Sequence, residues 1–124
     1  DGPALQRELL RLAAAVGAAL RREGLRGRTI TVKVRDADFR TRQAGLTLPE
    51  AVEADGTLYP VARGLLEELR GKRRTKVRLL GLGVSSLVEA GAPSQLELFR
   101  GDEGPEPERV RARSLLHQEQ RMGL

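Results

Sequence analysis

A change of hydrophobic period near residue 25 constrains the fold of this 124-residue chain more than any other feature. Before it, apolar side chains recur at steps of four and three, the spacing of one buried helix face, at Leu5, Leu9, Leu12, Val16 and Leu20. After it, residues 29–35 alternate strictly, with Ile30, Val32 and Val34 on one side and Thr29, Thr31, Lys33 and Arg35 on the other. The sequence therefore predicts an amphipathic helix followed by a strand with one buried face and one basic face.

Two further segments have extended character. Residues 36–38 form a turn with two aspartates, and residues 39–48 then predict a second strand that ends before Pro49. A last strand is expected over residues 76–88. Because the first two strands are joined by a short turn, we expect them to form a hairpin.

A second amphipathic helix is expected over residues 57–70, with Pro60 in its first turn. The order helix, strand, strand, helix, strand predicts an α+β fold. It is a two-layer sandwich in which an antiparallel sheet of three to four strands carries both helices on one face. The other face of the sheet remains open.

The composition of the chain changes after this core. Residues 1–90 are expected to fold as one domain, since 124 residues are enough for one core only. Residues 91–124 are expected to be a flexible tail, rich in Gly, Pro and acidic side chains over 101–108. Residues 109–122 have the spacing of a short helix, although one this short is marginal alone.

Composition also excludes several classes of protein. The chain has no Cys and no apolar run near the roughly 20 residues of a membrane span, so we expect a cytoplasmic protein without a membrane partner. Aromatic residues are only 2% of the chain, so stacking on bases is not expected to dominate any contact with nucleic acid.

The positive charge is concentrated in the predicted domain. Residues 1–94 hold 17 basic and 11 acidic side chains, a net charge of +6, whereas the remaining residues have a net charge of −1. Of the 22 basic side chains 19 are Arg, whose guanidinium group suits phosphate oxygens. This distribution indicates a polyanion partner, although an Arg bias can also reflect the nucleotide composition of a genome.

No catalytic constellation is evident in the sequence. His117 is the only histidine and lies in the predicted tail, where we expect a solvated side chain. Asp36 and Asp38 are explained by turn formation, and Ser85 has no basic partner arranged to activate it. Gly81 and Gly83 do not open a helix and therefore do not form a phosphate loop.

The pentapeptide Gln-Leu-Glu-Leu-Phe at residues 95–99 has the character of a docking peptide. Its apolar side chains lie in a polar surround that cannot bury them, whereas the groove of a partner protein would. The alternative is that Leu96 and Phe99 fold back onto the domain.

Four blocks of the chain follow one another in a recognisable order: residues 25–35 (LRGRTITVKVR), 37–41 (ADFRT), 47–49 (TLP) and 76–85 (KVRLLGLGVS). In sequence and in order they resemble the little finger domain of Y-family translesion DNA polymerases of the polymerase IV (DinB) type. Residues 95–99 follow where those enzymes carry a sliding-clamp-binding motif. The resemblance implies that Gln95, Leu96, Leu98 and Phe99 contact the replication sliding clamp.

The resemblance also implies a DNA site. In the family the open sheet face lies along the template-primer duplex and grips mainly phosphates. By position, the implied contacts are Gln43, Gly45, Thr47, Arg78 and Ser85. The strand alternation adds Lys33 and Arg35, and Arg40 and Arg42 would compensate for family arginines that are absent between residues 43 and 46.

Two further expectations follow from differences between this chain and the family. The family has a strand before the first helix, so the sheet of this chain would lack one edge strand. The family's palm, which would use Mg²⁺, is not represented, so no cofactor is expected in this fragment. The leading interpretation is a non-catalytic part of an error-prone translesion DNA polymerase that binds DNA and docks on the clamp. The alternatives are a catalytically inactive Y-family adaptor that recruits another polymerase to the clamp, and an independent protein or RNA interaction domain.

Overall fold

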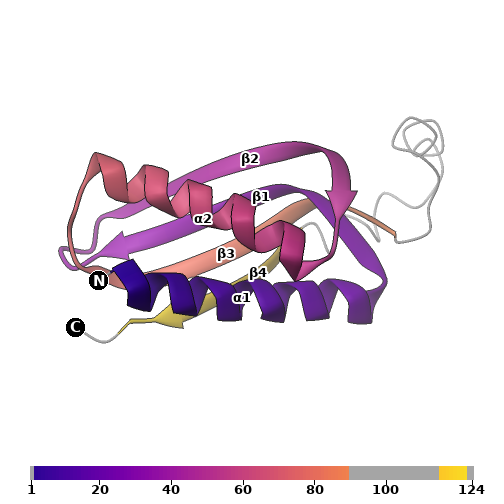
Figure 1. Ribbon diagram of the computed structural model, residues 1–124, viewed down its shortest axis with the longest axis horizontal. Helices are drawn as coiled ribbons and strands as arrows, with labels where there is room; N and C mark the ends of the chain where they lie inside the picture. Colours follow the sequence, from indigo (N-terminus) through magenta and orange to yellow (C-terminus); the bar gives the residue numbers. More distant parts are fainter. Residues whose placement is uncertain (1, 90–114, 123–124) are drawn as a thin grey trace.

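The sheet and the two helices are seen in a computed structural model, which describes residues 2–89 and 115–122. The elements follow one another as α1 (Gly2–Glu23), β1 (Leu25–Asp36), β2 (Thr41–Val52), α2 (Asp55–Lys72), β3 (Val77–Glu89) and β4 (Leu115–Arg121). The strands form one antiparallel sheet in the order β2-β1-β3-β4 (Figure 1). The predicted α+β class is confirmed.

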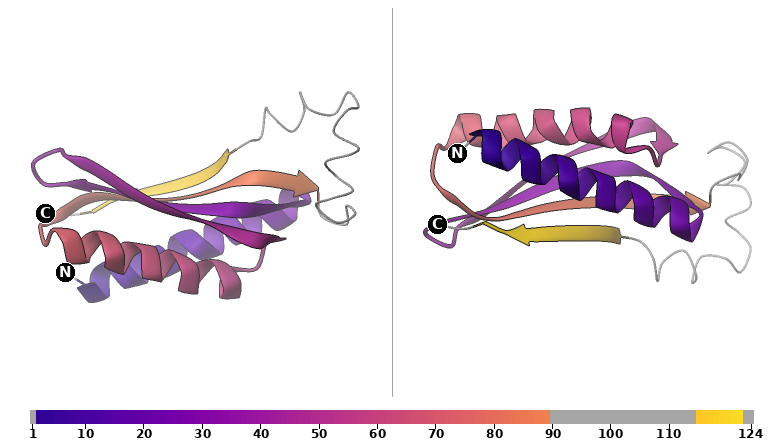
Figure 2. Two further views of the ribbon diagram at one scale, coloured as in Figure 1. Left: turned by 90° about the horizontal axis from the view of Figure 1, so that it is seen from above. Right: turned by 60° about the horizontal axis from the view of Figure 1, so that its bottom comes forward.

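The molecule has two layers. Both helices lie against the same face of the sheet, and no other described element covers the opposite face (Figure 2). The core between the layers is aliphatic: its fully buried large side chains are Leu9, Leu12, Val16, Leu20, Ile30, Val32, Val34, Leu58, Leu66, Leu80, Leu82 and Val84. The alternation of β1 therefore has the predicted sense, with its apolar side chains toward the helices and its polar side chains toward the open face.

Helix α1 buries the predicted leucine face and ends at Glu23, directly before Gly24. Gly24 has a φ of 69°, in the left-handed region that glycine adopts without a steric penalty, and its N–H donates to the carbonyl of Arg21. The left-handed residue reverses the chain, so β1 begins immediately afterwards at Leu25, four residues before the alternation becomes regular.

Strand β2 extends beyond the predicted boundary at Pro49. The pairing with β1 jumps from Thr29 opposite Thr47 to Gly27 opposite Val52, so a bulge accommodates the proline. Proline is tolerated there because β2 is an edge strand whose outer N–H groups have no strand to bond in the described sheet. The expected end of the strand at residue 48 is therefore wrong.

Helix α2 begins at Asp55, two residues before the predicted start. The N–H groups of Thr57 and Leu58 both donate to the carbonyl of Ala54, which closes the first turn early. Pro60 consequently lies beyond the first turn, inside the helix. In that position it removes one intrahelical hydrogen bond, because proline has no N–H.

The fourth strand comes from the C-terminal end of the chain. Leu115–Arg121 pairs with β3 from Ser85 to Leu79, and the N–H of Met122 donates to the carbonyl of Arg78 at 2.7 Å. The helix expected over residues 109–122 is wrong for this stretch, because pairing with β3 supplies backbone partners that an isolated short helix lacks. The sheet has four strands, with β4 at the edge beside β3, so the expectation of a sheet that is short of one strand is wrong. Residues 91–114 of the predicted tail lie outside the described residues.

No helix among the described residues is long and apolar enough to cross a membrane.

Candidate nucleic-acid interface

The register of the sheet defines the residues of its open face. Paired residues of neighbouring antiparallel strands point to the same side of the sheet. The residues paired with the polar positions of β1 therefore lie on the open side as well. Four rows of paired residues result, each in the order β2, β1, β3 and, in the first three rows, β4: Thr41–Arg35–Leu79–Arg121, Gln43–Lys33–Gly81–Glu119, Gly45–Thr31–Gly83–His117 and Thr47–Thr29–Ser85. We call this surface the open face.

An ion pair spans the middle of the open face. Lys33 Nζ lies 2.6 Å from a carboxylate oxygen of Glu119. Lys33 is on β1 and Glu119 is on β4, and β3 lies between these two strands. The intervening residue in the row is Gly81, and a Cβ placed there would lie 3.2 Å from Cγ of Glu119. The missing side chain therefore leaves the space in which Lys33 and Glu119 meet.

The same carboxylate has a second partner on β4. Nε2 of His117 lies 2.8 Å from Oε2 of Glu119. The hydrogen bond from Lys33, followed by that from His117, lowers the pKa of Glu119 below its usual value. Glu119 is thus held as a carboxylate among basic neighbours.

Hydroxyl groups line one end of the open face. Oγ1 of Thr29 lies 3.0 Å from Oγ1 of Thr47 and 2.9 Å from Oγ of Ser86. Ser86 has a φ of 56°, an uncommon conformation for a residue other than glycine, and its hydroxyl reaches Thr29 from this position. Neutral donors of this kind suit phosphate oxygens without reading base sequence.

Six of the nine residues predicted to contact DNA lie together on the open face. They are Lys33, Arg35, Gln43, Gly45, Thr47 and Ser85. Arg35 is exposed, and its Nε donates to the hydroxyl of Thr41 at 3.1 Å. The structure thus brings residues from three strands into one polar surface.

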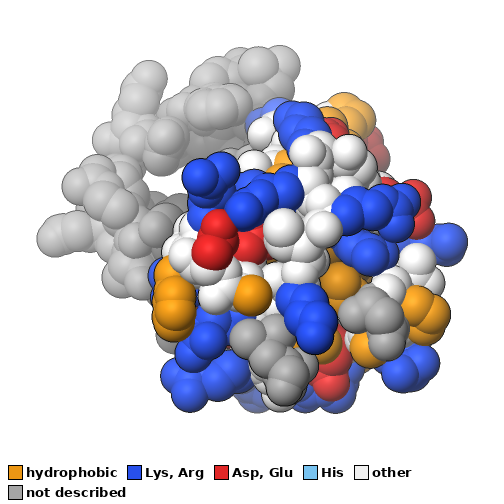
Figure 3. Space-filling view, turned by 90° about the vertical axis from the view of Figure 1, so that its left-hand side faces the viewer, with side chains coloured by type: hydrophobic (Ala, Val, Ile, Leu, Met, Phe, Trp, Pro, Cys, Tyr) orange, Lys and Arg blue, Asp and Glu red, His pale blue; other side chains and the backbone are white. Residues whose placement is uncertain are grey.

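Arg78 and Arg40 lie at the end of the sheet where β1 turns into β2. Arg78 is the extra residue of a bulge in β3, and its guanidinium carbon sits 4.3 Å from the centre of the Phe39 ring. Arg40 is exposed beside this turn. Figure 3 views this end of the molecule, where groups of Lys and Arg side chains surround smaller acidic and apolar areas.

Arg42 is not part of the open face. It pairs with Val34, whose side chain is buried under the helices, and it donates two hydrogen bonds to the carboxylate of Asp36 at 3.0 and 3.1 Å. It also donates to the carbonyl of Leu69 in α2. The structure therefore gives Arg42 a folding role in place of the predicted compensation on the DNA side.

Asp36 and its partners form a cluster that we call the hairpin-end cluster: Asp36, Asp38, Arg42 and Arg73. Arg73 donates to Asp36 at 2.8 Å and to Asp38 at 2.7 Å, which ties the β1–β2 turn to the segment after α2. The hydrogen bond from Arg73 lowers the pKa of Asp38 to about 2. Burial raises the pKa of Asp36, but hydrogen bonds led by that of Arg42 lower it overall.

Three residues of the open face were missed or misplaced by sequence reasoning. Arg121 and Glu119 were assigned to the tail, and His117 was expected to be a solvated tail side chain. All three lie on β4 and face the same side as Lys33. The alternation of His117, Glu119 and Arg121 with two glutamines is the only pattern that could have indicated this strand. It is short, and the alternate positions are not apolar, so it does not indicate a buried face.

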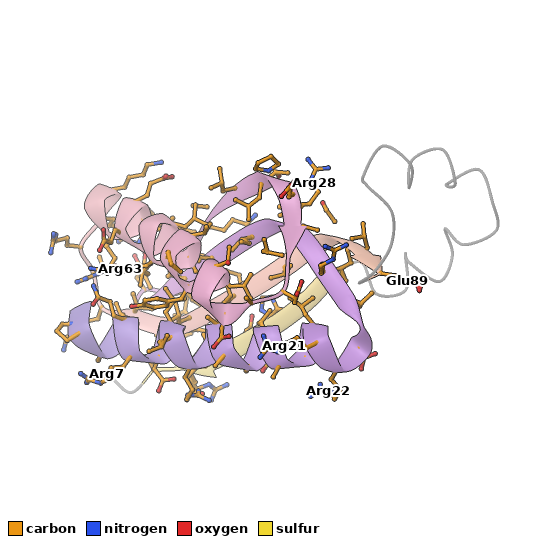
Figure 4. The ribbon with its side chains drawn as sticks, turned by 45° about the vertical axis from the view of Figure 1, so that its right-hand side comes forward. Arg7, Arg21, Arg22, Arg28, Arg63 and Glu89 are labelled. Atoms are coloured by element: carbon orange, nitrogen blue, oxygen red, sulfur yellow. The ribbon has the colours of Figure 1, made fainter. Side chains whose placement is uncertain are left out.

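Basic side chains are not confined to the open face. Arg7, Arg21 and Arg22 project from α1, and Arg63 projects from α2, on the helix side of the molecule (Figure 4). Arg21 donates to the carbonyl of Glu53, and Arg63 pairs with Glu67. Positive charge alone therefore does not select the binding face.

The described residues contain no group of three or more His, Asp or Glu side chains that could hold a metal ion. The predicted clamp contacts Gln95, Leu96, Leu98 and Phe99 lie outside the described residues.

Comparison with known proteins identifies the family. The family model described as "impB/mucB/samB family C-terminal domain" matches residues 1–98. A DNA polymerase IV of Akkermansia muciniphila is 43% identical over 82 residues, which are 66% of this chain and 23% of that protein. A DNA polymerase IV of Methanoculleus marisnigri is 39% identical over 99 residues, which are 79% of this chain and 26% of that protein.

A solved structure shares the fold. It is described as "Insertion ternary complex of Dbh DNA polymerase", and the match has a TM-score of 0.51 and 24% sequence identity over 66% of this chain and 23% of that chain. The chain thus spans about a quarter of the length of the relatives that it matches. It belongs to the impB/mucB/samB family as a C-terminal domain, the little finger of a Y-family DNA polymerase.

Proposed function

We propose that this domain grips template-primer duplex through DNA phosphates and docks the polymerase to which it belongs on the replication sliding clamp. The parent protein would be an error-prone translesion DNA polymerase whose active site and Mg²⁺ lie outside this chain. Cytoplasmic location also remains a prediction of the sequence.

The open face is the observation that carries the DNA part of the proposal. It presents Lys33, Arg35 and Arg121 beside hydroxyl and glycine positions, on a sheet face that no described element covers. Charged donors supply affinity that does not depend on sequence, and hydroxyl groups add hydrogen bonds to phosphate. A polymerase subdomain that moves along DNA needs contacts of this kind, because base readout would favour particular sequences.

The lack of aromatic side chains on this face supports phosphate contacts over base stacking. Phe39, at the turn, is 63% exposed, but the guanidinium of Arg78 covers one side of its ring. Open-face positions are instead Thr, Gly, Gln, Ser and charged residues, together with Leu79 and His117. Duplex DNA, whose bases are stacked internally, is therefore the better fit than a single strand bound by stacking.

A salt titration tests this proposal. Binding of the full chain to a labelled template-primer duplex should weaken steeply with salt, because each neutralised phosphate contributes about −0.9 to the log-log slope. Arg35→Gln should reduce the magnitude of that slope by about one. Affinity that is independent of salt, or strong preference for one sequence, would contradict phosphate gripping.

The clamp part of the proposal rests on the sequence of residues 95–99. Leu98 and Phe99 would fill apolar pockets, Gln95 would add a directional hydrogen bond, and Glu97 would point outward. Replacing Leu98 and Phe99 together with Ala should abolish binding to the clamp without weakening DNA binding. Glu97→Ala is the matched control and should bind as the parent does. Undiminished clamp binding by the double variant would place the docking site elsewhere.

A further inference from the structure

We propose that β4 restrains DNA binding by holding Lys33 in an ion pair with Glu119, so that a DNA phosphate must displace this carboxylate to reach the Lys33 ammonium. The inference rests on the proposed function of the open face. Strand β4 would thus regulate DNA binding from within the chain, because its Glu119 carboxylate competes with the DNA phosphate for Lys33.

The position of Glu119 carries the argument. Its carboxylate is the only acidic group of the four open-face rows, and it lies 2.6 Å from the central cation of that surface. A carboxylate there satisfies one donor of Lys33 and repels an approaching phosphate. The contact therefore opposes the electrostatic attraction on which the open face would depend.

The competition is reversible because the pair is accessible to solvent. The side chains of Lys33 and Glu119 are 28% and 36% exposed, and exposed ion pairs contribute little stability. His117 is 31% exposed and offers Glu119 an alternative partner at 2.8 Å. Glu119 therefore retains a hydrogen bond when Lys33 turns to phosphate.

Strand β4 itself is anchored independently of this pair. Seven residues of β4 are paired with β3, the N–H of Met122 donates to Arg78, and Arg11 of α1 donates to the side chain of Gln120. Gln120 points to the helix side, away from the ion pair. The exchange is thus one of side chains on a strand that stays paired.

The test uses the full chain and a short duplex measured by fluorescence anisotropy over a range of salt concentrations. Glu119→Gln keeps the shape of the side chain, removes its charge and should raise affinity about fivefold at low salt, as expected for one unit charge about 4 Å from a phosphate in water. The log-log salt slope should become steeper by up to about 0.9, the value for one additional phosphate contact. Glu67→Gln, on α2, makes the same change of net charge on the helix side and serves as the control.

The dependence on Lys33 separates the ion pair from a general effect of charge. In a Lys33→Gln background, Glu119→Gln should raise affinity clearly less than it does in the parent. The inference is overturned if Glu119→Gln has no more effect than Glu67→Gln, or the same effect with and without Lys33. If the parent and all variants bind DNA without salt dependence, both the proposed function and this inference fail.

Hydrogen exchange of the Met122 amide distinguishes side-chain exchange from release of the strand. Its protection should be the same in the parent and in Glu119→Gln, since the pairing with β3 is unchanged. Loss of that protection together with the gain in affinity would show that β4 detaches, which overturns exchange on a paired strand.

Discussion

The Asp36–Arg42 pair of the hairpin-end cluster and the Lys33–Glu119 pair each join a carboxylate to a basic side chain but differ in burial. The carboxylate of Asp36 is 0% exposed and the side chain of Arg42 is 16% exposed, whereas Lys33 and Glu119 are 28% and 36% exposed. Breaking a buried pair leaves an uncompensated charge, while breaking an exposed pair returns both groups to water. The Asp36–Arg42 pair therefore maintains the fold, whereas the charges of the Lys33–Glu119 pair are available to a ligand.

The largest expected effect is at the buried cluster. Asp36→Asn removes the charge that Arg42 and Arg73 both contact and should lower the free energy of unfolding by about 3 kcal/mol, measured in urea. Glu119→Gln should be close to neutral in the same assay. Comparable losses in the two variants would remove the contrast between the clusters.

Acid sensitivity should follow the hairpin-end cluster. The pKa of Asp38 falls from 3.8 to about 2 on folding, so its contribution is present above pH 3.8 and is lost as the pH falls toward 2. The lowered pKa of Asp36 acts with the same sign. Urea unfolding at a series of pH values should show a shallower fall for Asp38→Asn than for the parent between pH 4 and 2. An identical fall would mean that the ion pair with Arg73 does not contribute.

Arg78 tests the boundary between the two regions. Its guanidinium lies over Phe39 yet remains partly exposed, so Arg78→Gln should reduce the salt slope of DNA binding by about one while changing stability little. Arg63→Gln, on α2, is the matched control and should leave the slope unchanged. If Arg78→Gln also leaves it unchanged, the contact surface does not extend to the turn.

The fold could be predicted from sequence because hydrophobic period reports burial directly. The leucine spacing of α1 and the alternation of β1 each correspond to one face of one element. The early start of α2 rests on local hydrogen bonds to the carbonyl of Ala54, whereas the bulge at Pro49 depends on pairing with β1, so no local pattern indicated the bulge. Strand β4 was missed for the same reason: its pairing with β3 joins segments separated by residues 90–114.

The candidate site was predicted in part. Alternation placed Lys33 and Arg35 correctly on the open face, because each side of β1 has a distinct chemistry. The same reasoning did not distinguish Arg42, whose neighbours along β2 are polar on both sides. Its direction became evident only from its pairing with Val34 and its hydrogen bonds to Asp36.

The central claim is that the open face, rather than the arginine-bearing helix side, meets DNA. The most direct measurement compares two double variants in salt titrations of duplex binding. The open-face variant combines Lys33→Gln and Arg35→Gln, and the helix-side variant combines Arg7→Gln and Arg63→Gln, which is an equal change of charge. The first should lose about two units of slope, and the second should retain the slope of the parent. Equal losses in both, or a loss confined to the helix-side pair, would contradict the assignment of the open face.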